Sequence, residues 1–187
     1  FEKALARLQG QISENAARAQ NAVISAVQAM ETENVALADS VVEGDTAIDL
    51  AENAIEEQCL DILALYQPVA TDLRRVITIL KANGEIERAG DLAVNIANRV
   101  EDAKRYKKAV AWDFDKMGSY ATTMFVDSLV ALAKSDVPLA RAILARDDEL
   151  DALHKKSYER ATEGILSTPA AAGYYLDALT VSRCLER

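Results

Sequence analysis

Apolar residues recur every three or four positions through most of the chain, in segments separated by residues that cap or interrupt helices. This period indicates amphipathic α-helices, each with one apolar face turned to a common core. The first segment, residues 1–30, carries Leu5, Leu8 and Ile12 at this spacing. Five further helices are expected to begin at Asn34, near Pro68, at Asp113 or Asp115, at Ser135 or Asp136, and at Thr168.

Two of these helix starts make specific predictions. Asn34 is expected to be the N-cap of the second helix, because its side chain can accept a backbone N–H bond of the first turn. Pro68 is expected in the first turn of the third helix, where a missing N–H does no harm. The third helix is expected to run to about Lys108.

The order of helix starts occurs twice, and individual residues repeat with it. Val35 and Leu37 are matched 102 positions later by Val137 and Leu139, whereas Glu87-Arg88 is matched 99 positions later by Glu186-Arg187. The sequence therefore predicts an all-α protein of six helices, a tandem duplication of a three-helix antiparallel bundle. The first bundle is expected in residues 1–108 and the second in residues 109–187. Because the second copy stops at the counterpart of Arg88, we expect it to be truncated and the protein to continue beyond Arg187.

Composition narrows the classes of function. Only 7 Gly and 3 Pro occur in 187 residues, and the 50% hydrophobic content can fill a core. The 30 acidic and 21 basic residues give a net charge of −9, which disfavours nucleic acid as a partner and favours metal cations and basic protein surfaces. A single histidine excludes sites built from several imidazoles, and two cysteines outside any CxxC pair indicate reduced thiols of a cytoplasmic protein. The longest uncharged run is too short to cross a bilayer.

The third helix contains an unusual change of pattern. Its apolar stripe of Leu73, Val76, Ile77 and Leu80, continued past Gly84, meets Glu87 and Asp91. Either the helix bends near Gly84, or its face changes from apolar to acidic. The two carboxylates are neighbours at i and i+4 and repel each other unless something compensates, and a divalent cation could do so. A solvated helix face with arginines nearby is the alternative.

Related acids recur elsewhere. Asp45/Asp49 and Asp147/Asp151 have the same i, i+4 spacing and occupy equivalent places in the two copies, and Glu186 stands where Glu87 stands in the first copy. The repetition predicts two equivalent metal sites. The chain shows no nucleophile–base pair and no glycine-rich phosphate loop, so we expect it not to be an enzyme.

Three runs of residues resemble the PhoU family, regulators associated with the bacterial phosphate-specific transport system. They are Leu65-Tyr66-Gln67-Pro68-Val69-Ala70-Thr71-Asp72-Leu73-Arg74-Arg75, Glu87-Arg88-Ala89-Gly90-Asp91 and Ala93-Val94-Asn95-Ile96-Ala97. The resemblance implies metal binding at the Glu/Asp-x-x-x-Asp motif and at the recurrent acids of the second and fifth helices. The metal is a divalent or transition ion, with iron, zinc, manganese and magnesium left open. The family usually has His after the motif aspartate, where this chain has Leu92.

The resemblance also implies partners. It predicts a cytoplasmic adaptor that passes the state of a phosphate ABC transporter, through its ATPase, to a sensor histidine kinase and restrains phosphate-starvation genes. Its membrane association would be peripheral, through these partners, and a homodimer is compatible with it. Two alternatives stay open: an adaptor for a different phosphate carrier on a similar fold, and a di-metal carboxylate enzyme. The latter needs two Glu-x-x-His pairs, and the chain contains only His154.

Overall fold

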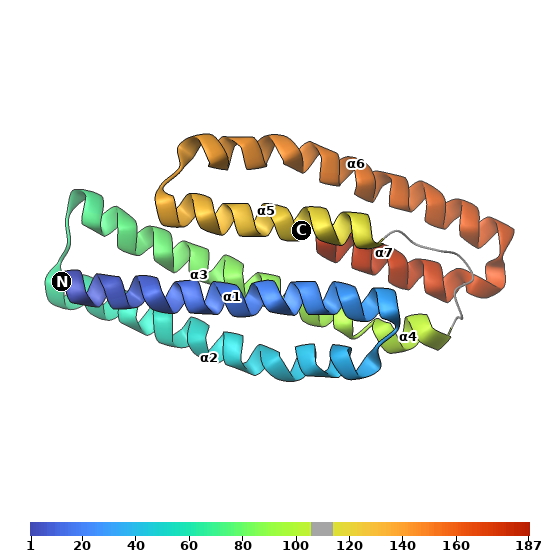
Figure 1. Ribbon diagram of the computed structural model, residues 1–187, viewed down its shortest axis with the longest axis horizontal. Helices are drawn as coiled ribbons and strands as arrows, with labels where there is room; N and C mark the ends of the chain where they lie inside the picture. The colour runs from blue at the N-terminus through green and yellow to red at the C-terminus, as the bar shows by residue number, and fades with distance from the viewer. Residues whose placement is uncertain (106–113) are drawn as a thin grey trace.

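A computed structural model describes residues 1–105 and 114–187, apart from the side chain of Asp115. Its helices are α1 (Glu2–Thr32), α2 (Val35–Tyr66), α3 (Ala70–Ala97), α4 (Val100–Arg105), α5 (Phe114–Lys134), α6 (Val137–Ser167) and α7 (Ala172–Glu186), with the 3₁₀ turn η1 (Pro169–Ala171) before α7 (Figure 1). The described residues contain no strand, and the all-α prediction is confirmed. None of the described helices is long and apolar enough to span a bilayer.

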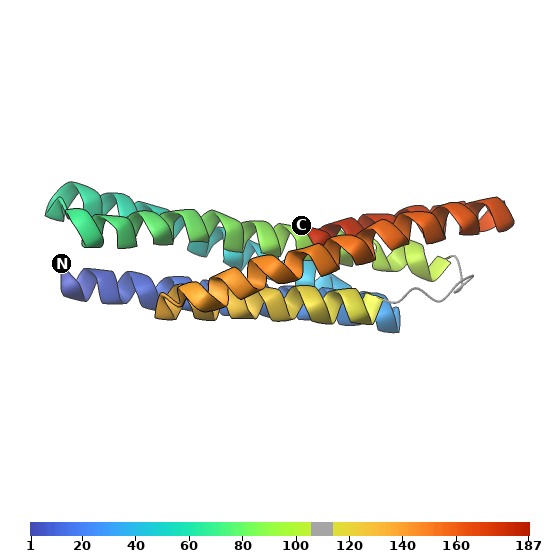
Figure 2. The ribbon, with the colours of Figure 1, turned by 90° about the horizontal axis from the view of Figure 1, so that it is seen from above.

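The helices form an elongated molecule in which like helices of the two repeats meet. α1, α2 and α3 pack on one another, and α5 packs on α6 and α7. Across the junction, α1 lies against α5 and α3 against α7. The α2–α3 turn therefore lies at one end of the molecule and the α6–α7 turn at the other (Figures 1 and 2).

The turn between the first two helices is the same in both repeats. The side chains of Asn34 and Asp136 are the N-caps of α2 and α6, and each accepts a backbone N–H three residues on, at 3.1 and 2.9 Å. The residue before each cap, Glu33 or Ser135, is left-handed with φ of 54°. The predicted cap at Asn34 and the internal repeat are thus confirmed, and of the two residues left open for the start of α6, Asp136 is the N-cap.

The start of the third helix differs from the prediction. α3 begins at Ala70 with Val69 at its N-cap, so Pro68 lies in the turn before the helix and not in its first turn. The pyrrolidine ring still ends the helical path from α2, because it disfavours helical backbone at the residue before it. Gln67, which precedes the proline, is left-handed with φ of 45°.

The third helix is also interrupted earlier than predicted. α3 ends at Ala97, and a separate short helix, α4, begins at Val100. Asn98 and Arg99 between them form a turn. The predicted helix end at Lys108, the predicted domain boundary after it and the predicted helix start at Asp113 lie outside the described residues.

The buried face of α3 follows a different line from the predicted one. Leu73 is 39% exposed. Within one uninterrupted helix, the buried positions continue past Gly84 and are Val76, Ile79, Asn83, Ile86, Gly90, Ala93, Ile96 and Ala97. The prediction was wrong because Asn83 looks like a solvent-facing residue in the sequence. Its amide is buried and donates to the backbone oxygen of Glu52 at 2.8 Å, so a polar residue continues the core stripe.

The buried hydrophobic residues form two clusters, and the boundary between the clusters does not coincide with the boundary between the repeats. One cluster, with Leu8, Ile55 and Val76, belongs to α1, α2 and α3. The other, with Ala29, Ile96 and Tyr175, contains residues of both repeats. The two repeats therefore share buried surface at their junction.

Inside the second repeat, α6 and α7 approach so closely that only glycine fits at their contact. Gly164 of α6 lies so close to the buried ring of Tyr175 in α7 that a Cβ at position 164 would overlap the ring. Both residues sit in regular helices, so neither can move far without shifting its helix.

We expect Gly164→Ala to lower the free energy of unfolding by about 2–3 kcal/mol, since overpacking of a closed core has this cost. Gly10 in α1 is the control, because a Cβ there would meet nothing within 4 Å. Gly10→Ala should raise stability by about 0.5–1 kcal/mol through helix propensity. Urea unfolding followed by circular dichroism measures both changes, and equal stabilities of the two variants would contradict the packing argument.

Candidate functional site

α2 and α3 approach closely at Gly90, in the middle of the Glu87–Asp91 motif. A Cβ at position 90 would lie 3.0 Å from Cδ1 of Ile48 and 3.2 Å from Oδ1 of Asp45. The missing side chain thus allows the Asp45 carboxylate to lie against the α3 backbone. Helix geometry then places Glu87 and Asp91, which flank the buried glycine, at the border of the α2–α3 contact.

Folding gathers carboxylates from both helices at this contact. Burial raises the pKa of Asp45, and the charges of Asp49 and Asp91 raise it further. Burial is also the main cause of the raised pKa of Glu87, followed by the charges of its carboxylate neighbours Asp91, Asp49, Glu52 and Asp45. We call these five residues the acidic edge. It unites the predicted pair of α2 with the predicted pair of α3.

Among the described residues, no basic side chain neutralises the carboxylates of the acidic edge. None of its carboxylates is within ion-pair distance of a lysine or arginine among the described residues. Within that same part of the chain, no three His, Cys, Asp or Glu side chains converge closely enough to hold a metal ion. The edge is therefore a group of mutually repelling carboxylates at the protein surface, whose side chains are not arranged as a finished coordination shell.

The acids of the second repeat are more dispersed. Asp147 and Asp151 are exposed on α6, and Glu186 is half-buried at the end of α7. Asp147 and Glu186 line the same cleft, whereas Asp151 does not. The structure thus brings two of the three predicted residues of this repeat to one cavity.

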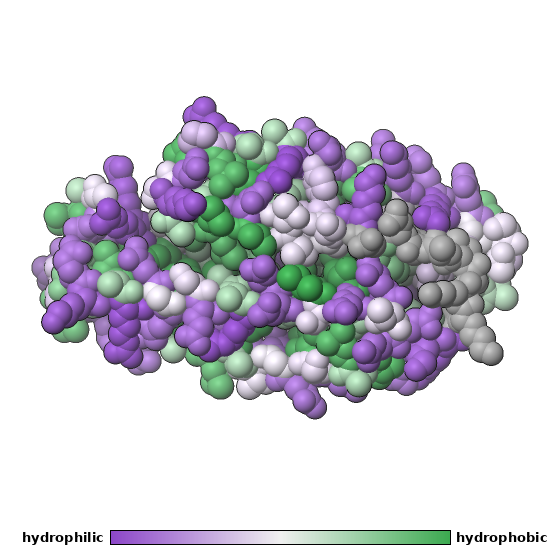
Figure 3. All heavy atoms as spheres, viewed as in Figure 1, coloured by the Kyte–Doolittle hydropathy of each residue, from purple (hydrophilic) through white to green (hydrophobic). Residues whose placement is uncertain are grey.

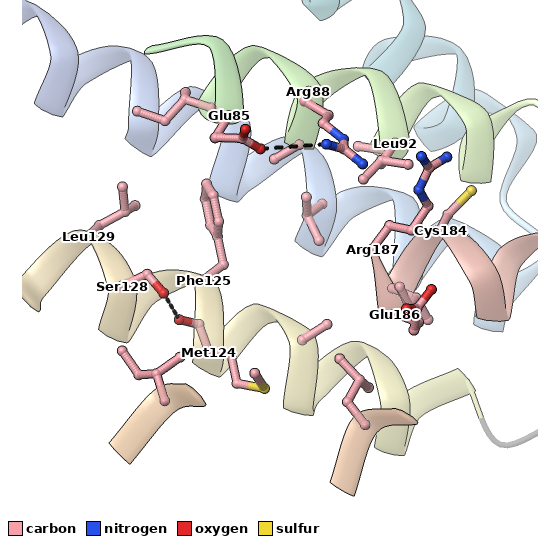
Figure 4. A pocket seen from close by; sticks show the side chains of 18 of the residues that line it. Glu85, Arg88, Leu92, Met124, Phe125, Ser128, Leu129, Cys184, Glu186 and Arg187 are labelled. Atoms are coloured by element: carbon pink, nitrogen blue, oxygen red, sulfur yellow. Dashed lines mark hydrogen bonds and ion pairs between the residues drawn. The ribbon is translucent and has the colours of Figure 1, made fainter. Parts of the chain in front are cut away.

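This cleft lies where the two repeats meet. It has a volume of about 430 Å³ and is lined mainly by apolar side chains of α3, α5, α6 and α7. Figure 4 shows its α3 side with Glu85, Arg88 and Leu92, its α5 side with Met124, Phe125, Ser128 and Leu129, and the end of α7 with Cys184, Glu186 and Arg187. On the visible face, apolar surface gathers where α5 lies against the first repeat (Figure 3).

The single histidine and the two thiols lie among core residues. His154 is half-buried, and its Nδ1 lies 2.9 Å from Oγ of the fully buried Ser182. Burial raises the pKa of Cys59 to about 11 and also raises that of Cys184. Both cysteines are free, and thiols whose pKa is raised stay protonated at neutral pH.

Comparison with known proteins places both repeats in one family. The PhoU domain matches residues 12–100 and again residues 114–187. The chain belongs to the PhoU family. Among named PhoU proteins, a phosphate-specific transport system accessory protein PhoU homolog from Aquifex aeolicus is 33% identical over 99% of this chain and 84% of its own length. A PhoU homolog from Thermotoga maritima is 33% identical over 100% of this chain and 82% of its length.

Solved PhoU structures have the same fold. The crystal structure of PhoU from Pseudomonas aeruginosa superposes with a TM-score of 0.96 at 28% identity, over 100% of this chain and 90% of that one. PhoU from Streptococcus pneumoniae gives 0.87 at 25% identity, over 100% and 88%. The family resemblance of the sequence runs is therefore confirmed.

The sequence alone did not identify Glu52 of α2 as a site residue. Glu52 belongs to the acidic edge, and its pKa is raised by burial and by the charges of Glu56 and Asp49. Its own acidic i, i+4 partner is Glu56, and neither residue is repeated as an acid in the second copy. The repeat offset of 102 places His154 at the counterpart of Glu52. Leu92, the residue after the motif aspartate Asp91, lines the cleft.

The acidic edge makes stability depend on pH in a defined direction. A carboxyl whose pKa is raised by folding holds its proton more tightly in the folded state. Its stabilising contribution is therefore full below the ordinary pKa of about 4–4.5 and is lost as pH rises through the raised value. Glutamine does not titrate, so Glu87→Gln should remove the part of this pH-dependent loss of stability that comes from Glu87. The protein is treated with a chelator so that bound metal does not mask the effect.

We expect the Glu87→Gln protein to lose less stability than the parent between about pH 4.5 and 7, the range above the ordinary carboxyl pKa. Glu57→Gln is the control, because Glu57 is exposed on α2 and outside the acidic edge. Thermal melts across this range measure the effect. Parallel melting curves for parent and Glu87→Gln would show that folding does not raise the pKa of Glu87.

Proposed function

We propose that this PhoU-family chain is a cytoplasmic accessory regulator of a phosphate-specific transporter. In this role it contacts the ATPase of the transporter, conveys its state to a sensor histidine kinase, and restrains phosphate-starvation genes when phosphate is plentiful. The observation that carries the proposal is the match of both repeats to the PhoU domain, together with relatives named as accessory proteins of the phosphate-specific transport system.

The helical architecture supports an adaptor and offers little for catalysis. The buried Ser182 beside His154 is inaccessible to a substrate, since its exposed fraction is 0%. Two Glu-x-x-His pairs, which a di-iron-type bundle enzyme needs, cannot be formed with one histidine in the chain. The names of the relatives favour the phosphate-specific transporter over another phosphate carrier.

Co-purification from membranes tests the partner. The tagged full-length protein is isolated from phosphate-replete cells, and bound proteins are identified by mass spectrometry. We expect the transporter ATPase and the sensor kinase, and expect phosphate-starvation genes to be expressed when the gene is deleted. Recovery of a different phosphate carrier, with normal repression in the deletion strain, would overturn the proposal.

We further propose that the acidic edge binds a divalent metal ion. Its donors are carboxylate oxygens, which hard divalent cations prefer, and no protein cation neutralises them among the described residues. Glu87 and Asp91 of α3 and Asp45 and Asp49 of α2 would hold the ion after their side chains turn toward one another. The ion would replace carboxylate repulsion across α2 and α3 by attraction. We extend the proposal to Asp147, Asp151 and Glu186 as the corresponding residues of the second repeat.

Glu87→Gln combined with Asp91→Asn should weaken binding of Mn²⁺ or Zn²⁺ at least about tenfold, a loss that removal of even an outer ligand partner can cause. The matched control is Glu57→Gln with Asp61→Asn. These exposed α2 residues have the same types and the same i, i+4 spacing, and the charge change is identical. Metal content by elemental mass spectrometry and affinity by calorimetry give the result. Equal loss in the two double variants would mean that net charge, and not the acidic edge, determines binding.

A further inference from the structure

The α2–α3 turn exposes an unusual amount of apolar surface at the end of the molecule. Leu65 is 75% exposed and Val69 76%, and Tyr66 and Leu73 beside them are also exposed. These four residues, which we call the apolar tip, belong to one short turn and the ends of the two helices that it joins. Isolated exposed leucines are ordinary, whereas a cluster at a protruding end indicates a surface for contact.

The backbone of this turn is held in a sterically unfavourable form. Gln67 and Ala70 both have positive φ, 45° and 49°, although each carries a Cβ. Such values are uncommon outside glycine and persist only where the surrounding structure imposes them. The turn therefore presents Val69, which lies between these two residues, in one defined position.

Basic side chains stand directly behind the apolar tip. Arg74 and Arg75 are exposed one turn into α3. Arg75 lies 3.4 Å from Asp72, and Arg74 forms no ion pair with any described residue. In a chain of net charge −9, whose helix α2 has no lysine or arginine, this is a local basic site beside apolar side chains.

The equivalent turn of the second repeat lacks this combination. The α6–α7 turn exposes Leu166 (78%) and, on α7, Leu176. It has no residue of positive φ and is formed by the 3₁₀ turn η1. The residue pair Arg74-Arg75 has no arginine counterpart 99 positions later, where Gly173 and Tyr174 stand. The duplicated fold thus does not require these features at the α2–α3 turn.

We propose that the apolar tip is a docking element that inserts into an apolar recess of a protein partner whose rim carries carboxylates. Leu65 and Val69 enter the recess, and Arg74 pairs with an acidic side chain at the rim. The inference rests on the proposed function only for the choice of partner, the phosphate-specific transporter. It assigns a role to the Leu65–Arg75 run, which the acidic edge leaves unexplained.

The charges around the apolar tip favour a protein recess over a lipid surface as its binding partner. Asp61 on α2 and Asp72 on α3 lie next to the tip, and the net charge of the chain is −9. An anionic membrane would repel this surface as a whole, and two arginines contribute only weak attraction to it. A protein recess can place single carboxylates opposite Arg74 and leave the acids of α2 in water.

The test compares the two ends of the molecule. The first variant carries Leu65→Ser and Val69→Ser, and the matched control carries Leu166→Ser and Leu176→Ser at the opposite end. All four side chains are exposed, and Val69 is the N-cap residue of α3, a position that favours serine. Thermal melts should therefore be close to that of the parent for both variants.

Binding is measured by surface plasmon resonance to the purified transporter in nanodiscs of zwitterionic lipid and to empty nanodiscs containing phosphatidylglycerol. We expect the tip variant to bind the transporter at least about tenfold more weakly, the loss typical of buried interface anchors, and the control to bind as the parent does. Equal weakening of both variants, or of neither, would overturn the docking role. Binding of the parent to empty anionic nanodiscs, lost in the tip variant, would assign the tip to lipid instead.

A charge variant separates the rim contact from the apolar contact. Arg74→Glu should weaken transporter binding and reduce its dependence on salt, because it removes an attractive pair. Arg141→Glu, at an exposed arginine of α6, is the control of equal charge change. Identical salt dependence in these two variants would overturn the acidic rim. No binding by the parent protein would instead contradict the proposed function itself.

Discussion

The close approach of α2 to α3 at Gly90 is the constraint on which the candidate site depends. Because no side chain separates the helices there, Ile48 and Asp45 of α2 lie against the α3 backbone. The same approach forces Glu87 and the acids of α2 into one another's field, which burial then strengthens. A larger residue at position 90 would separate α2 from α3 and increase the distance between their carboxylates. The mutual repulsion of these carboxylates is thus a consequence of how closely α2 and α3 pack.

The sequence predicted what is encoded locally. The helix cap at Asn34 follows from residue type and is present, whereas the start of α6 was narrowed to Ser135 or Asp136, of which Asp136 caps the helix. The course of the α3 core face could not be predicted, because it depends on a partner outside the helix: Asn83 is buried only because α2 offers the oxygen of Glu52. For the same reason, the sequence could place acids on one helix face but could not show which acids of α2 face those of α3.

Asn83 has a companion in the first bundle. Asn15 of α1 is fully buried, and its amide donates to the backbone oxygen of Ile48 at 3.3 Å. Both amides thus bond to α2 one turn apart, from α1 and from α3. Their amide oxygens are buried without a protein partner, which makes this polar layer costly. A single buried amide can fix helix register, and two bonded to adjacent turns of α2 oppose sliding of α1 and α3 along it.

The second repeat has a polar layer at the equivalent positions, but it is formed by different residues. At the offset of 102, Asn15 and Glu52 correspond to Met117 and His154. At the offset of 99, Asn83 corresponds to Ser182. Oγ of Ser182 bonds to Sδ of Met117 at 3.4 Å and lies 2.9 Å from Nδ1 of His154. At the counterpart of Glu52, a side chain that belongs to the acidic edge in the first repeat has become a partner of the core. This replacement lowers the acidic charge of the second repeat where the first concentrates it, so the duplicated fold does not impose equal electrostatics on its two halves. The register-fixing layer can therefore be retained while the carboxylates beside it diverge.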